Sequence, residues 1–347
     1  MGDIKISKFK DVNLDDCFFD SLKADYPGFE RWFRKKSEEN IYILEKDNSV
    51  QAFLYMKVED DDDYEIEPPL ILNGEKILKV GTFKINAHGS KLGERFIKLI
   101  FDKMIEEKIT KSYVTIYKKQ DALISLLSEY GFNYYGTKKG EQVYIKNFNK
   151  ITGDIKQDYP IIRLGETKKF LLSIYPKYHT ELFPDSKLRT ERNHIIKDLS
   201  HTNCIEKIYL SGSYNITNYK KGDIIAIYRT GDSGKPAEYS AVVTSICTLC
   251  DVKDINEFEN KEEFFKYCSD RTIFKLKELE YFWNTKKYPY IITLLYNSAL
   301  NKRIIRKELI EEIGVSRLER IVVSPLEDVQ MCEILDRGGV SNLIIKE

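Results

Sequence analysis

The residues around Gly93 have the types and spacing of a phosphate-binding turn. Residues 79–85 are predicted to form a strand, and a short loop separates them from an apolar pattern with intervals of three and four residues. This pattern predicts a helix that begins near Leu92. The first N–H groups of a helix lack partners within it and lie at the positive end of its dipole, so they stabilise a phosphate. Lys91 and Arg95 would add positive charge at the same place.

A second strand and helix follow at a short distance. Residues 113–117 are predicted to form the strand and residues 120–130 the helix, which Gly131 and Phe132 would end. A closing hairpin is expected over residues 134–146. The elements expected upstream are a strand at 4–9, short helices from Asn13 and from Phe29, and a hairpin over 40–58.

Together these segments resemble the GNAT family of N-acetyltransferases. The family motif Gln/Arg-x-x-Gly-x-Gly/Ala is matched with Gly93 as the second glycine, Lys91 in place of the first and His88 in place of Gln/Arg. The segment from Gln120 resembles the family's Asn-x-x-Ala-x-x-Leu-Tyr-x-x-x-Gly-Phe element. In that element Leu127 stands where many members have the tyrosine that protonates the departing thiolate. The predicted order of strands and helices is also the family's order.

The resemblance implies acetyl-CoA as the cofactor. On this basis the strand at 82–85 would pair with the pantetheine arm, and backbone N–H groups at 91–95 would hold the pyrophosphate. The cofactor-binding residues expected from the resemblance are Thr82, Phe83, Lys84, Ile85, His88, Gly89, Lys91, Leu92, Gly93, Glu94, Arg95 and Gln120.

Acetyl transfer to an amine also needs a proton for the leaving thiolate and a neutral nitrogen as the nucleophile. Because the family's usual acid is missing, the candidates are Tyr130, on the same predicted helix face, and Tyr117, at the end of its strand. Glu67 is the candidate general base, with Glu65 and Glu141 as alternatives, and an already neutral amine would need no base. Each of these side chains could instead be structural.

Residues 59–69 form an acidic, proline-containing run that does not suit a core strand, so we expect an exposed connection. Two interpretations are open for it. The run is either a solvated loop, or it leans over the acceptor site and supplies a carboxylate that attracts a cationic amine.

The chain of 347 residues is long enough for two domains. We predict a two-domain α/β (α+β) fold. A GNAT-like domain with a mixed central sheet flanked by helices would cover residues 1–148. A linker and helical connection would cover 149–200, and a second domain 201–347. Within the connection, helices are predicted at 168–174 and 186–199.

The second domain resembles, more weakly, the PUA-like barrels of the ASCH and EVE type. The resemblance rests on the turn at 219–223, placed before a strand that ends at Tyr228 and Arg229, although the Gly-x-Lys-x-x-Glu signature of ASCH domains is absent. It implies a β-barrel with added helices that docks a substrate or RNA. The expected contacts are Tyr214, Lys221, Tyr228 and Arg229, whose tyrosines could equally be packing residues.

Composition and charge limit the other functions. The net charge is zero, so an RNA partner would have to be held by a local patch. No apolar run reaches the length of a membrane span and no signal-peptide pattern is present, which predicts a cytoplasmic protein. His201, Cys204, Cys247 and Cys250 could be proposed as zinc ligands, but strand residues three apart face opposite sides, so we expect buried, inert thiols and no metal.

The function expected from the sequence is therefore N-acetyl transfer from acetyl-CoA to an amine on RNA, on aminoacyl-tRNA or on a ribosome-associated protein. Two alternatives are open. One is a CoA-binding regulatory module with weak catalysis, and the other is a toxin-like acetyltransferase.

Overall fold

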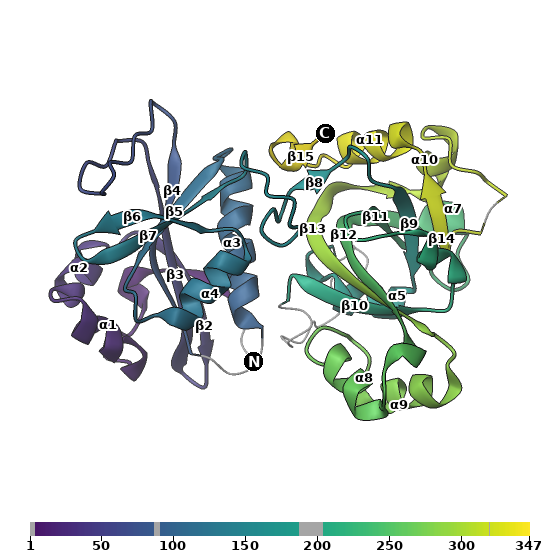
Figure 1. Cartoon of the computed structure of the whole chain (residues 1–347), viewed down its shortest axis with the longest axis horizontal. Coiled ribbons are helices and arrows are strands. Elements are labelled where there is room, and N and C mark those ends of the chain that lie inside the picture. The colour runs from purple at the N-terminus through teal and green to yellow at the C-terminus, as the bar shows by residue number, and fades with distance from the viewer. Residues whose placement is uncertain (1–3, 87–90, 187–203, 319) are drawn as a thin grey trace. The chain divides into compact units, whose positions relative to one another are not determined.

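The computed structural model describes residues 4–86, 91–186, 204–318 and 320–347. The chain forms two compact units, Met1–Lys150 and Ile151–Glu347 (Figure 1). None of the helices that the structure describes is long and apolar enough to cross a membrane.

The first unit is built on a seven-stranded sheet with the order β1-β2-β3-β4-β5-β7-β6. Neighbouring strands are antiparallel except for the parallel pair β4 and β5. The strands are β1 (Lys5–Lys8), β2 (Asn40–Lys46), β3 (Ser49–Glu59), β4 (Ile77–Ile85), β5 (Lys111–Ile116), β6 (Asn133–Lys138) and β7 (Glu141–Asn147). The helices are α1 (Asp20–Asp25), α2 (Phe29–Lys35), α3 (Leu92–Glu106) and α4 (Asp121–Glu129). The α/β character predicted for this half is therefore confirmed.

The parallel strands β4 and β5 separate part of the way along their length. In the described residues their pairing is confined to Leu78 with Ser112, Lys79 with Tyr113 and Val80 with Val114. Strand β4 nevertheless continues to Ile85 and β5 to Ile116. The sheet is thus forked beyond Val80.

Gly81 sits at the beginning of this fork. The register between β3 and β4 shifts there, because Tyr55 faces Thr82 whereas Met56 faces Val80, leaving Gly81 as an extra residue. A Cβ at Gly81 would lie 2.6 Å from Cδ1 of Tyr55, so only glycine lets the tyrosine ring lie against this bulge.

Helices cover both faces of the first sheet. Tyr55, opposite Thr82, packs in an aromatic cluster with the segment that carries α1 and α2. We call this side the α2 face. Phe83 points to the other side, because successive strand residues alternate, and it stacks on Phe96 of α3 with ring centroids 5.9 Å apart.

The second unit has a six-stranded sheet with the order β10-β13-β12-β11-β9-β14, and Figure 1 shows its long strands β12 and β13 strongly bent. The predicted barrel is not confirmed, since this sheet is open between β10 and β14 in the described residues. Its strands are β9 (Lys169–Ile174), β10 (Glu206–Ser211), β11 (Ile224–Arg229), β12 (Val242–Asp254), β13 (Tyr290–Ile305) and β14 (Val323–Leu326), beside a small pair of β8 (Ile162–Arg163) and β15 (Ile345–Lys346). The helices are α5 (Pro176–Leu182), α7 (Ala237–Ser240), α8 (Lys261–Cys268), α9 (Leu276–Thr285), α10 (Arg306–Glu311) and α11 (Asp328–Arg337).

The described part of the predicted linker and helical connection, residues 149–186, contains strands β8 and β9 and helix α5. The predicted helix at 168–174 is instead strand β9, which lies between β11 and β14 and is almost wholly buried. A six-residue segment with four apolar residues, buried on both faces, has no period that distinguishes a strand from a helix. The helix predicted at 186–199 lies, after Ser186, outside the described residues.

The turn before β11 is held by a buried carboxylate. Asp223 is fully buried and accepts hydrogen bonds from the backbone N–H groups of Lys168 at 2.9 Å and of Lys220 at 2.8 Å. Gly222 supplies the positive φ of 96° that the turn requires. The Lys-Gly-Asp sequence is thus explained by local structure.

Replacing Asp223 with alanine should destabilise the second unit by about 1–3 kcal/mol, because both N–H groups lose their acceptor. Asp223→Asn keeps one carboxamide oxygen and should lose less. Urea denaturation of the full chain measures both effects. Equal stability of the two variants and the wild type would contradict this account.

Candidate functional site

A cleft of about 820 Å³ opens in the first unit at the fork of its sheet. Its walls come from β4 over residues 79–85, the end of β5, the first turns of α3 and α4, and the segment that joins α1 to α2. The cleft therefore lies where β4 has lost its neighbour β5.

One end of the cleft is the beginning of α3. Leu92 and Gly93 line it, and their N–H groups lie in the helical turn that has no internal acceptors. Lys91 precedes the helix with φ 49° and ψ 17°, in the left-handed region. Lys91 stands where the GNAT motif has its first glycine, and it adopts the backbone conformation that favours glycine.

Gly93 also has a packing role. A Cβ at this position would lie 2.7 Å from Cδ2 of Leu126 on α4, which is a lining residue of the cleft. The absence of a side chain thus allows the two helices to approach closely beside the site.

The strand β4 forms the long wall of the cleft. Lys84 is anchored there, because its Nζ donates to the carbonyl of Phe18 and to Oγ of Ser21, the latter at 2.6 Å. Burial lowers the pKa of Lys84, while the carboxylates of Asp20 and Asp25 act in the opposite direction. Lys84 therefore ties β4 to the segment around α1.

The structure brings most of the predicted cofactor-binding residues to one cavity. Those that line it are Thr82, Phe83, Lys84, Ile85, Lys91, Leu92, Gly93 and Gln120. Glu94 and Arg95 lie on α3 outside the lining, and Glu94 forms an ion pair with Lys91 at 3.2 Å. His88 and Gly89 lie outside the described residues.

The predicted catalytic residues are not among those that line this cavity. Tyr130 follows the end of α4, is fully buried and lies outside the lining. Tyr117 packs against the ring of Tyr26 at 5.1 Å between centroids, outside the lining. Glu67 is exposed and lies outside the lining as well, held through backbone hydrogen bonds with Thr137.

Other acidic side chains line the cleft instead. Glu141, one of the alternatives for a general base, accepts a hydrogen bond from the hydroxyl of Tyr26 at 2.7 Å. Burial raises the pKa of Tyr26, and the Glu141 carboxylate raises it further. Glu59, at the end of β3, was not among the predicted site residues. The alternation of β3 could have indicated it, since Glu59 lies four residues after the cleft residue Tyr55.

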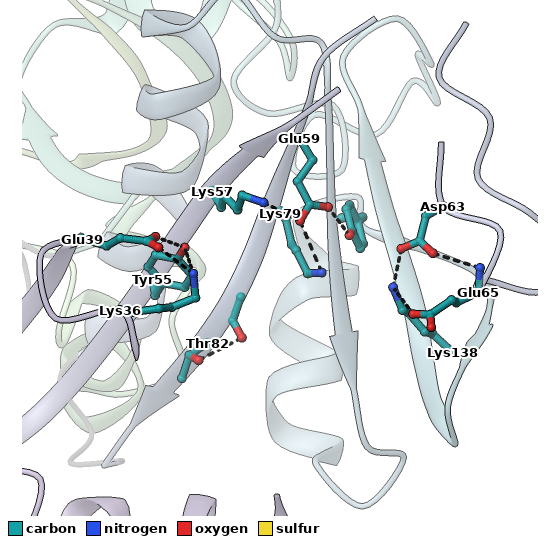
Figure 2. A network of polar contacts seen from close by, with 12 residues as sticks. Lys36, Glu39, Tyr55, Lys57, Glu59, Asp63, Glu65, Lys79, Thr82 and Lys138 are labelled. Atoms are coloured by element: carbon teal, nitrogen blue, oxygen red, sulfur yellow. Dashed lines mark hydrogen bonds and ion pairs between the residues drawn. The ribbon is translucent and has the colours of Figure 1, made fainter. Parts of the chain in front are cut away.

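Two polar clusters lie on the α2 face of the sheet (Figure 2). In the first, Lys36 donates to Glu39 at 2.8 Å and to the hydroxyl of Tyr55 at 2.9 Å, and Tyr55 itself donates to Glu39. Burial raises the pKa of Tyr55, and the hydrogen bond to Glu39 raises it further. The Glu39 carboxylate and the Lys36 ammonium group therefore neutralise each other's charge and are hydrogen-bonded to each other.

The second cluster centres on Glu59. One of its oxygens lies 3.6 Å from Nζ of Lys57 and 3.6 Å from Nζ of Lys79, while the other accepts from the hydroxyl of Tyr113 at 2.7 Å. Both lysines line the cleft. Figure 2 shows both ammonium groups near the same oxygen of the carboxylate.

Apart from Glu59, the acidic run of residues 59–69 lies outside the lining of the cleft. Asp63 and Glu65 form ion pairs with Lys138, and Glu65 forms another with Lys139 at 2.7 Å. From the whole run, Glu59 is the member that lines the cleft. The run behaves as an exposed connection tied to the β6–β7 hairpin.

The predicted contacts of the second unit do not gather in one place. Tyr228 lines a pocket of about 630 Å³ together with Tyr175, Lys177 and Arg306. Arg229 is buried and paired with Asp232 at 2.7 Å. The two remaining residues lie outside the lining of this pocket: Tyr214 beside Tyr290, and Lys221 near Asp154.

The cysteines of the second unit show no metal-binding arrangement. No group of three or more His, Cys, Asp or Glu side chains able to hold a metal occurs in the described residues. Burial raises the pKa values of the Cys247 and Cys250 thiols, which favours their inert, protonated form. His201, one of the four ligands considered from the sequence, lies outside the described residues.

Comparison with known proteins finds solved structures of similar fold. No family model matches the chain, and no curated protein matches it. The PaiA N-acetyltransferase of Thermoplasma acidophilum, solved with coenzyme A, is similar over 42% of this chain and 99% of its own, with 15% identity and a TM-score of 0.29. The N-acetyltransferase PseH of Campylobacter jejuni, solved with acetyl-coenzyme A, is similar over 42% and 98%, with 15% identity and a TM-score of 0.28.

The ASCH protein of Zymomonas mobilis is similar over 49% of this chain and 94% of its own, with 11% identity and a TM-score of 0.33.

The left-handed conformation of Lys91 can be tested by paired substitutions. Lys91→Gly should leave the free energy of unfolding within about 1 kcal/mol of wild type, whereas Lys91→Val should cost about 1 kcal/mol or more relative to Lys91→Gly. Both variants lose the same ion pair to Glu94, so their difference isolates the backbone. Thermal or urea unfolding measures it, and a valine variant as stable as the glycine variant would contradict the assigned conformation.

Proposed function

We propose that the first unit is an acetyl-CoA-dependent N-acetyltransferase. The observation that carries the proposal is the fork between β4 and β5, which opens a cleft ending at the first turn of α3. Beyond Val80 the backbone of β4 lacks its β5 neighbour in the described residues, so its polar groups are available to an extended arm. The N-terminus of α3 then offers N–H groups and positive charge to a pyrophosphate.

The reaction joins an amine to an acyl group. The thioester supplies an activated acetyl group: the amine nitrogen attacks its carbonyl carbon, the C–N bond forms and the C–S bond breaks. The amine loses a proton and the thiolate gains one, so no net proton is consumed. Glu59 and Glu141 line the cleft as carboxylates able to accept the amine's proton, and Tyr26 and Tyr55 line it as hydroxyls.

The second unit bears on the class of acceptor. An acceptor on RNA, on aminoacyl-tRNA or on a ribosome-associated protein follows from its resemblance to PUA-like domains, and the pocket of Tyr228, Tyr175 and Arg306 combines aromatic and cationic groups. The dispersal of Tyr214, Lys221 and Arg229 gives this acceptor class no further support.

A CoA-binding module without catalysis is the second candidate function. The observation in its favour is that Leu127 is buried where many members of the family have their acid, and that neither Tyr117 nor Tyr130 lines the cleft.

Filling the cleft from α4 tests the proposal. Ala122 is exposed and lines the cleft, so Ala122→Trp should block the site with little cost to folding. At a CoA concentration of about 100 times Kd, wild type should gain about 2.7 kcal/mol of stability, and Ala122→Trp should gain almost none. Thermal unfolding with and without CoA measures the difference.

Ser125→Trp is the matched control, because Ser125 is exposed on the same helix and lies outside the cleft lining. It should respond to CoA as wild type does. A wild-type protein that CoA does not stabilise would refute the proposal. Stabilisation by CoA without thiol release across a broad panel of amines would favour the binding module.

A further inference from the structure

The cleft has two distinct ends, one at the N-terminus of α3 and the other at Lys79. Strand β4 lines it continuously from Lys79 to Ile85, a span of roughly 20 Å at about 3.3 Å per residue. The chain passes from Ile85 towards α3, so this end holds the phosphate-binding turn. Lys79 marks the opposite end, where the reactive end of an extended arm and the acceptor would meet.

Two like charges face each other at this opposite end. Lys57 and Lys79 are direct partners across β3 and β4, an arrangement that is unfavourable unless it is compensated. Glu59 is the carboxylate that both ammonium groups approach, and its second oxygen is occupied by Tyr113. Both ammonium groups therefore contact one carboxylate, and Asp63 and Glu39 act on Lys79 and Lys57 respectively only through electrostatics over longer distances.

The two ammonium groups also have unused hydrogen-bonding capacity. At 3.6 Å their contacts with Glu59 are ion pairs longer than hydrogen bonds, and in the described part of the chain neither group makes a hydrogen bond of ordinary length. The side chain of Lys57 is 54% exposed and that of Lys79 26% exposed. Lys36, in contrast, is satisfied by Glu39 and Tyr55.

We propose that Lys57 and Lys79 bind an anionic group of the acceptor, a carboxylate or a phosphate, close to the amine that is acetylated; this inference rests on the proposed function. An oxyanion beside the two lysines would make charge-assisted hydrogen bonds with both. Glu59 lies next to that position and offers a carboxylate to the acceptor's ammonium group. A polyamine carries only positive charge, so the two lysines would repel it at this place.

Matched pairs of amines test the inference by thiol release from acetyl-CoA. Suitable pairs are amino acids with their amides, phosphoethanolamine with ethanolamine, and glucosamine 6-phosphate with glucosamine; spermidine represents the polyamines. The anionic member should have a KM lower by about tenfold or more, and the pair that shows the larger preference tells carboxylate from phosphate. Lys57→Gln and Lys79→Gln should each reduce the preference for the anionic member within a pair about tenfold, because the oxyanion loses one of its two cations.

Lys35→Gln is the matched control. Lys35 is exposed on α2 and lies outside the cleft lining, so the variant removes the same charge from the same unit and should leave both KM values unchanged. Equal KM values within pairs, a preference for spermidine, or no effect of Lys57→Gln and Lys79→Gln would each overturn the inference.

Two further measurements separate this inference from the proposed function. CoA binding is followed by thermal shift in every variant, and its absence in wild type counts against the acetyltransferase itself. If CoA binds but no amine of the panel turns over, calorimetry with CoA-saturated protein measures binding of the same pairs. Failure of the anionic members to bind better than their neutral partners would then overturn the inference alone.

Discussion

The separation of β4 from β5 after Val80 is the constraint on which the first unit depends. A parallel pair that stayed hydrogen-bonded to its end would close the cleft. The bulge at Gly81 lies directly after Val80, the last residue of β4 that pairs with β5. The Tyr55 ring lies against this bulge and belongs to the aromatic cluster of α1 and α2. Its hydroxyl joins Lys36 and Glu39. The glycine at position 81 thus connects the backbone bulge with the packing of Tyr55 and with the polar wall of the site.

Positively charged groups lie at both ends of the cleft. The dipole of α3 provides positive potential at one end, and two lysines that share one carboxylate provide it at the other. The intervening wall is mostly uncharged strand backbone with small or apolar side chains. The acidic run of residues 59–69, which had suggested a cationic acceptor, uses Asp63 and Glu65 in ion pairs with lysines outside the cleft.

Local sequence signals predicted the elements of the first unit better than the chemistry within it. The helix that starts at Leu92 and the strand at residues 79–85 follow from periodicity, because each buries one face. Tyr130 shows the limit of this reasoning: helical spacing relates residues on one face but does not tell whether that face meets the site or the core. Glu59 and the lysine pair depend on strand register, which sequence leaves open. Strand β9 escaped prediction because burial on both faces removes its alternation.

The segment that carries α1 and α2 is fastened to the sheet at several points around the cleft. Lys84 holds the carbonyl of Phe18 and the hydroxyl of Ser21, Tyr26 reaches Glu141, and Asp25 pairs with Lys119. These bonds are made between groups of the protein itself, so they restrict the conformational freedom of the wall. A ligand then meets a preorganised surface, and less of its interaction energy is consumed in ordering the protein.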